Sequence, residues 1–178
     1  MLFDPTIYSS EVQAILALDG HGRREMPLNG EGSAEEAHRR IQAAGAAQLF
    51  PGARAPEAAL AGLLAYFSLM DEAHQVAQRA EDQDHDFWHA IVHRREPDAG
   101  NSAYWFRRVG AHPIFPALRE EAARLGVDFG PRWDPFAFID YCERARRRPG
   151  SPEERTARTV QLAEWQLLFD SCARPHAA

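Results

Sequence analysis

The stretch PEAALAGLLAYFSLMDEAHQVAQR, residues 56–79, decides the fold class of this chain. Its large apolar residues recur three and four positions apart, at Leu60, Leu63, Leu64, Phe67 and Met70. This spacing places them along one face of an α-helix, whereas a half-buried strand would alternate every second residue. Pro56 has a fixed backbone angle that suits the first turn of a helix. The pattern predicts one continuous helix over residues 56–79, with its apolar stripe in the core.

Start and stop signals on both sides of this stretch predict an all-α, single-domain bundle of about six to eight helices. Ser33 with Glu36 and Ser151 with Glu154 match the capping box of a helix N-terminus. The expected helices run from Ser9 or Ser10 to Leu18, from Ser33 to Ala47, over 56–79, from His85 to Arg95, from Ser102 to Val109, from Pro116 to Leu125, from Asp134 to Arg147 and from Ser151 past Phe169.

Length and charge narrow the class of protein further. The 178 residues suit one helical domain over 1–178, with an N-terminal arm at 1–8, a glycine-rich loop at 19–32 and a tail at 175–178. The net charge of -6 disfavours nucleic acid and anionic membranes as partners. All 20 basic residues are arginines. Without lysine, Schiff-base chemistry and a phosphate-loop lysine are excluded.

The ends and the cysteines indicate a cytoplasmic protein. The N-terminal sequence lacks the basic start and apolar run of a signal peptide, and no apolar run is long enough to span a bilayer. Cys142 and Cys172 lie far apart within helical patterns. They are expected to be buried free thiols, because neither a disulfide framework nor a CxxC metal motif is present.

Chemically reactive side chains concentrate in residues 84–113, DHDFWHAIVHRREPDAGNSAYWFRRVGAHP. This stretch holds four histidines, two tryptophans and two Arg-Arg pairs, flanked by acids. The remainder of the chain reads as alanine-rich helix and connecting loop. A functional site is therefore expected where residues 85–96 meet the end of residues 56–79 and the turn at 101–112.

One hypothesis for this site is a metal centre. His89 and His93 are four residues apart, so that a helix brings both imidazoles to one face, and Glu96 follows at the next turn. Asp71 and His74 form a second pair on the preceding helix. Ligands from two facing helices, here Asp71, His74, His89 and His93, would suit zinc, iron or manganese. His89, His93 and Glu96 are also candidate catalytic groups, because an imidazole oriented by an acid can act as a general base.

A second hypothesis is an anion pocket. Two Arg-Arg pairs flank the turn at 96–101, and guanidinium groups bind carboxylates and phosphates bidentately. Neighbouring aromatic rings can stack on a flat ligand. The candidate ligand contacts are Arg94, Arg95, Asn101, Tyr104, Trp105, Arg108 and His112. The expected partner is a small phosphorylated or carboxylated metabolite.

The segment HAIVHRREPDAGNSAYWFRRVGAHP, residues 89–113, resembles a segment of a family of uncharacterised bacterial and fungal proteins. The resemblance implies no activity, cofactor or residue role. From the residues, the leading hypothesis is a small-molecule pocket built within 71–112, with metal assistance left open. The alternative is a non-catalytic structural or protein-interaction module in which the same side chains form a buried polar network. Neither enzymatic activity nor oligomeric state follows from the sequence.

Overall fold

A computed structural model describes residues 3–30 and 34–175. Within these residues the chain forms ten α-helices and two short 3₁₀ helices, without a strand. The α-helices are α1 (Ser10–Ala17), α2 (Glu35–Ala43), α3 (Ala46–Leu49), α4 (Pro56–Tyr66), α5 (Met70–Ala77), α6 (Gln83–Arg95), α7 (Ala99–Val109), α8 (Phe115–Arg124), α9 (Pro135–Arg146) and α10 (Pro152–Ala173). The predicted all-α fold is confirmed, and the helix count exceeds the predicted range.

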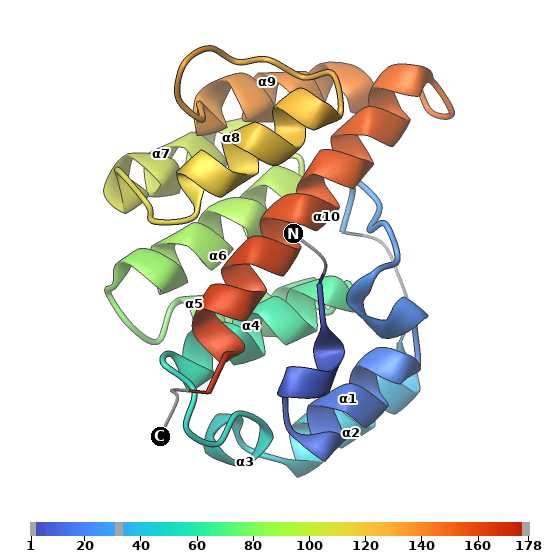
Figure 1. Ribbon diagram of the computed structural model, residues 1–178, viewed down its shortest axis with the longest axis vertical. Helices are drawn as coiled ribbons and strands as arrows, with labels where there is room; N and C mark the ends of the chain where they lie inside the picture. The colour runs from blue at the N-terminus through green and yellow to red at the C-terminus, as the bar shows by residue number, and fades with distance from the viewer. Residues whose placement is uncertain (1–2, 31–33, 176–178) are drawn as a thin grey trace.

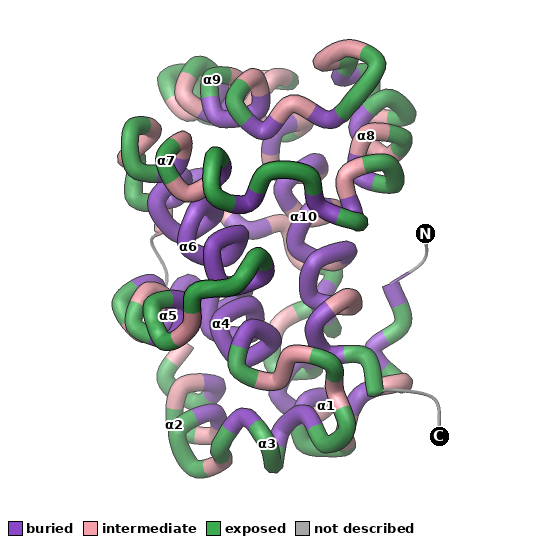
Figure 2. Tube along the Cα trace, turned by 90° about the vertical axis from the view of Figure 1, so that its left-hand side faces the viewer, coloured by how far each residue is buried: buried purple, intermediate pink, exposed green. Residues whose placement is uncertain are grey.

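Helix α10 runs through the length of the molecule (Figure 1). Helices α7, α8 and α9 gather around one of its ends, and α1, α2 and α3 lie at the other (Figure 1). The trace of α4 and α6 is almost wholly buried between them (Figure 2). These two helices form the interior of the molecule. Their buried side chains are accordingly either apolar, as in α4, or polar with partners inside the protein, as in α6.

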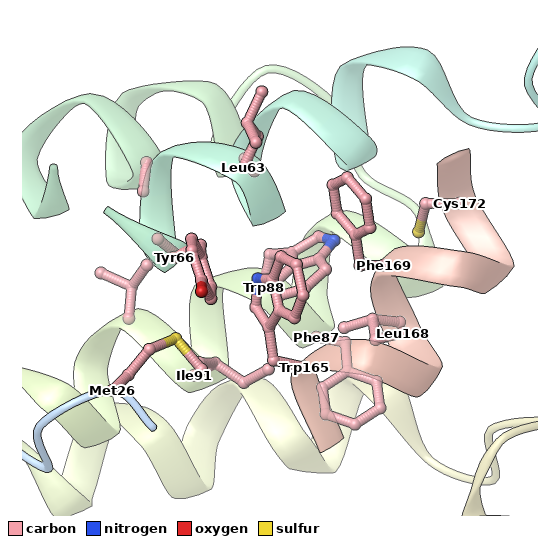
Figure 3. Packing of buried hydrophobic residues seen from close by; sticks show 14 of the residues in the cluster. Met26, Leu63, Tyr66, Phe87, Trp88, Ile91, Trp165, Leu168, Phe169 and Cys172 are labelled. Carbon is pink, nitrogen blue, oxygen red and sulfur yellow. The ribbon is translucent and has the colours of Figure 1, made fainter. Parts of the chain in front are cut away.

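The centre of the core lies where α4, α6 and α10 meet (Figure 3). Trp165 of α10 stacks on Phe169 and donates its indole N–H to the carbonyl of Gly62 at 2.7 Å. A Cβ at Gly62 would lie 2.5 Å from the ring of Trp88. Glycine at this position therefore allows the indole of α6 to pack against the backbone of α4.

The predicted continuous helix over residues 56–79 is wrong. Helix α4 ends at Tyr66, Ser68 adopts a left-handed backbone angle (φ 59°), and α5 begins at Met70. Arg95 of α6 holds this break, because its guanidinium donates to the carbonyl of Ala65 and to the hydroxyl of Ser68. The break depends on a partner that is distant in sequence, and the local apolar spacing carries no sign of it.

Helix boundaries differ from prediction at several caps. Helix α6 is capped by Asp82 and begins before the predicted start at His85. Helix α7 begins at Ala99, before the predicted start at Ser102, because Asp98 accepts from the N–H of Asn101. The predicted helix to Ala47 ends at Ala43, and residues 46–49 form the separate α3. Ser33 of the expected capping box lies outside the described residues. The predicted caps Asp134 and Ser151 are confirmed.

The segments outside the α-helices are partly ordered into turns. The arm at residues 3–8 contains a 3₁₀ turn at Pro5–Ile7, and the loop after α1 contains another at Gly20–Gly22. Cys142 and Cys172 are free and buried, as expected. Among the described helices, none has the combination of length and apolar composition that crossing a membrane requires.

Candidate metal centre

Three histidines from two helices meet at one place. His89 and His93 lie one turn apart on α6 with their rings stacked 4.9 Å apart, and α5 brings His74 against both of them. One nitrogen from each ring can be chosen so that all three lie within 4.8 Å of one another. The i, i+4 spacing in the sequence predicts the α6 pair, and the antiparallel packing of α5 on α6 supplies the third imidazole.

The closest contact joins the two helices. Nε2 of His74 lies 2.6 Å from Nε2 of His89, so one of these nitrogens carries a proton that the other accepts. The side-chain amide of Gln78 lies 2.9 Å from the same nitrogen of His74. Ligands of a tetrahedral zinc, with bonds of about 2.0–2.1 Å, lie roughly 3.3 Å apart. To bind such an ion, the two histidines must lose the shared proton. Their Nε2 atoms must also move apart, by less than about one ångström from their present distance.

The surrounding side chains fix the rings in place. Trp105 of α7 stacks on His89 at 3.8 Å, and the guanidinium of Arg108 lies over the indole of Trp105 at 5.1 Å. A carboxylate oxygen of Glu96 lies 3.2 Å from Nδ1 of His93. A carboxylate beside one ring nitrogen orients the other nitrogen toward a ligand, which is the arrangement common around metal-bound histidines.

Burial keeps the imidazoles neutral. Desolvation, reinforced by His74 and His93, lowers the pKa of His89 to about 3. Desolvation also lowers the pKa of His93, although Glu96 opposes this change. Nδ1 of His89 is buried without a hydrogen-bond partner among the described residues. At neutral pH His89 and His93 therefore present uncharged imidazoles with lone pairs, the form in which histidine binds a metal.

Two of the residues nominated with this cluster behave differently from His74, His89 and His93. Asp71 is exposed and does not belong to the histidine group. The predicted set of four metal ligands is therefore corrected to His74, His89 and His93. It was placed there by extending the stripe of a continuous helix, which the break at Ser68 interrupts. Glu96 contacts His93, and its position makes it an orienting group for that ring.

The predicted anion contacts are not all brought together. Arg94 is fully buried and its two terminal nitrogens face the carboxylate of Glu164, with one contact of 3.1 Å. Arg95 is fully buried as well and donates to the carbonyls of Pro27 and Ala65 and to Ser68. Their donors are used inside the core. The prediction that Arg94 and Arg95 contact an anion in an exposed pocket is therefore corrected: both are buried structural residues.

The remaining nominated residues are spread over three environments. Arg108 pairs with Asp86 at 3.1 Å, and Tyr104 is half-exposed. Asn101 folds back onto the cap residue Asp98, to which its amide donates at 2.7 Å. His112 lies on the far side of α6, where its Nε2 is 3.2 Å from a carboxylate oxygen of Asp84. Only Trp105 of the predicted anion contacts touches the histidine cluster.

Sequence reasoning missed a buried polar group around Asp84. Besides His112, this carboxylate receives the guanidinium of Arg54 at 2.8 Å. Burial by itself would raise the pKa of Asp84, but the hydrogen bonds from His112 and Arg54 hold it well below its usual range. Arg54 lies in the loop between α3 and α4, and no local pattern links it to α6. It was not predictable from spacing.

The resemblance of residues 89–113 to a family of uncharacterised bacterial and fungal proteins stays a prediction. No protein-family model, curated protein or solved structure matches the chain.

Proposed function

We propose that His74, His89 and His93 bind one divalent transition-metal ion, and that the protein uses this ion to bind and act on a small molecule. The observation that carries the proposal is the convergence of three imidazole nitrogens within 4.8 Å of one another. Random surface histidines lack this arrangement, because it requires two helices to meet in one register.

The ligand set favours zinc. Imidazole nitrogens suit zinc, iron, copper and nickel, whereas manganese prefers carboxylate and carbonyl oxygens. The exposure of Asp71 removes the oxygen ligand that would favour manganese. Three histidines leave one position of a tetrahedral zinc for water or substrate, as in catalytic zinc sites. Zinc in such a site lowers the pKa of its bound water and polarises carbonyl groups.

The protein residues around the ion have separate roles. Glu96 orients His93 through the contact at Nδ1, and Trp105 fixes the plane of the His89 ring. His74 comes from the short helix α5 and is half-buried, so its ring is the one that can shift to open the site. Tyr104 and Arg108 lie beside Trp105, where they can contact an incoming small molecule.

A second candidate function is structural. The hydrogen bond between His74 and His89, together with the stacking of His89 between His93 and Trp105, also suits a polar network that joins α5, α6 and α7 without an ion. This network would make the segment a non-catalytic module. If the histidines serve only as this network, the melting temperature of the protein should not change when a chelator is added. The metal-binding experiment below measures this.

The test is metal binding by tagless protein, measured by elemental analysis and by cobalt titration followed in the visible spectrum. We expect one ion per chain, a tetrahedral cobalt spectrum, and a lower melting temperature after chelation. His74→Ala should lose the ion and the spectrum while keeping the helical circular dichroism, because His74 is the least buried of the three. His38→Ala is the matched control, since His38 pairs with Glu72 away from the cluster.

Two results would decide against a metal ion at His74, His89 and His93. A protein that takes up neither zinc nor cobalt, and whose melting temperature ignores chelator, would leave the structural network as the function. Equal cobalt spectra from the parent protein and His74→Ala would place the ion elsewhere.

A further inference from the structure

A cavity of about 920 Å³ lies on a different side of the molecule from the histidine cluster. It is open to solvent on one side and is lined by the C-terminal end of α7, by α8, by the connection between α8 and α9, and by the first turn of α9. These elements lie together at one end of the molecule (Figure 1). Pockets of roughly 300–1,000 Å³ are the size that encloses a small organic ligand.

Helix α7 separates the cavity from the histidine cluster. Successive residues of an α-helix are rotated by about 100°. Trp105 and Arg108 therefore share one side of α7, and Phe106, Arg107 and Gly110 share the opposite side. The first pair faces the histidines and the second set lines the cavity. The two sites can be occupied and mutated independently.

The walls of the cavity are rich in aromatic rings. The aromatic lining residues are Phe106, Phe115, Phe129, Trp133 and Phe136. Phe129 and Trp133 pack edge to face at 5.6 Å, and Phe136 remains 40% exposed although it is a large apolar side chain. The indole Nε1 of Trp133 is buried without an acceptor among the described residues. This wall offers flat apolar surfaces to a ligand.

The charge at the cavity is positive. Arg107, Arg119 and Arg132 line it, and none of the three forms an ion pair with another described residue. Of the two lining acids, Asp134 is engaged as the cap of α9, where it accepts from the N–H groups of Phe136 and Ala137. Glu120 is the other. The cavity lining therefore carries three guanidinium groups and one carboxylate, that of Glu120, which is not used as a helix cap.

The helix ends around the cavity are largely satisfied by the protein itself. At the N-terminus of α9, the carboxylate of Asp134 supplies the negative charge that a helix N-terminus favours. At the end of α7, the carbonyls of Val109 and Ala111 accept from the side-chain amide of Gln83, at 2.7 and 2.6 Å. The negative end of α7 is thus partly satisfied from α6. An anionic ligand meets attractive groups and few exposed acceptors.

We propose that this cavity binds a small molecule with a flat aromatic body and a carboxylate or phosphate head group. The rings of Phe129, Trp133 and Phe136 receive the body, and the guanidinium groups of Arg107 and Arg132 receive the head group. Arginine suits this role because its planar fork binds carboxylate and phosphate with two hydrogen bonds. The proposal does not rest on the metal centre.

The test compares 2-naphthoate with the neutral 2-naphthamide, which has nearly the same shape. Binding is measured by titration of the four tryptophan indole N–H signals in nitrogen-edited NMR spectra. Trp133 reports on the cavity and Trp105 on the histidine cluster, with Trp133→Phe and Trp105→Phe used for assignment. We expect 2-naphthoate to shift the Trp133 signal and to bind at least about tenfold more tightly than the amide. The Trp105 signal should stay unchanged.

The matched variants are two double substitutions of exposed arginines. Arg107→Gln with Arg132→Gln should weaken 2-naphthoate by about tenfold or more and leave 2-naphthamide unchanged, so that the preference for the anion disappears. Arg147→Gln with Arg148→Gln removes the same charge at the opposite end of α9 and should bind both compounds as the parent protein does.

Three results would overturn the proposal. One is equal affinity of the parent protein for the acid and the amide, or binding of neither. Another is a naphthoate-induced shift at Trp105 instead of Trp133. The third is an equal loss of naphthoate affinity in both double variants, since this would reflect net charge alone. Each readout is independent of metal loading, so failure here and failure of the metal centre are distinguishable.

Discussion

The two Arg-Arg pairs at the ends of α6 and α7 have the same composition and opposite surroundings. Arg94 and Arg95 are at most 1% exposed. The guanidinium group of Arg94 pairs with Glu164, and that of Arg95 donates to backbone carbonyls. Arg107 and Arg108 are exposed, one against the cavity and one over Trp105. The contrast shows that helix burial decides whether an arginine is a structural group or a candidate ligand contact.

The buried pair itself contains a contrast. Arg94 has a carboxylate partner, whereas Arg95 has neutral acceptors only: two carbonyls, a hydroxyl and the sulfur of Met26. Burial, with Arg94 next to it, lowers the pKa of Arg95. Two of these acceptors, the carbonyl of Ala65 and the hydroxyl of Ser68, lie at the carbonyl end of α4, where a helix dipole favours positive charge. Arg95 therefore stabilises the break between α4 and α5 that brings His74 to the cluster.

The largest effect is expected from Glu164→Gln. This substitution leaves Arg94 charged and buried without a counterion, which costs about 3–5 kcal/mol of unfolding free energy. Urea denaturation at neutral pH measures the loss. Arg94→Met combined with Glu164→Leu removes both charges and should recover most of it. If Glu164→Gln alone were as stable as the parent protein, water or another group would have to neutralise Arg94.

An intermediate effect is expected at Asp84, whose partners His112 and Arg54 differ in burial. Asp84→Asn should cost about 1–2 kcal/mol at neutral pH, since the exposed side of Arg54 is screened by solvent. The folded-state pKa of Asp84 is lowered, so its stabilisation is present above the unfolded pKa of about 3.9 and is lost as the pH falls below it.

Urea denaturation of the parent and Asp84→Asn at several pH values checks this sign. The difference in unfolding free energy should be full at neutral pH and should shrink in acid. A difference that stays constant down to pH values well below 3.9 would contradict the pairing. Asp140→Asn, an exposed carboxylate on α9, is the control and should show no such dependence.

The smallest effect on stability is expected from Arg107→Gln. Its guanidinium lies 5.9 Å from the ring of Phe136 and forms no ion pair within the described residues, so the change should stay within about 0.5 kcal/mol. Thermal melting measures it. A loss comparable to that of Glu164→Gln would make Arg107 a structural residue and remove the contrast between the two pairs.

The sequence predicted the elements of the fold better than their limits. The caps Asp134 and Ser151 were predictable because capping depends on neighbouring residues. The break at Ser68 was not predictable, because the apolar spacing continues through it and Arg95 arrives from another helix. Asp71 was lost from the site with that break, and His74 reached it by the packing of α5 rather than by helical continuity.

The site was predictable only in part, for the same reason. The spacing of His89 and His93 fixes their common face within one helix, so the sequence is sufficient for that pair. Burial of Arg94 and Arg95 ran against expectation, because fully buried arginines are rare and need partners that the local sequence does not contain. The cavity depends on α7, α8 and α9 together, and its arginines are separated by up to 25 positions (107 to 132).

By itself, the sequence determined the helical class, the starts of α1, α4, α8, α9 and α10 to within about one residue, the histidine pair of α6 and the absence of lysine chemistry. These properties depend on residues within about one or two helical turns of each other. The tertiary structure alone decided the division of residues 56–79, the third histidine, the burial of one Arg-Arg pair and the cavity beside the other. Each of these requires contacts between helices, whose energies depend on distances that no local pattern encodes.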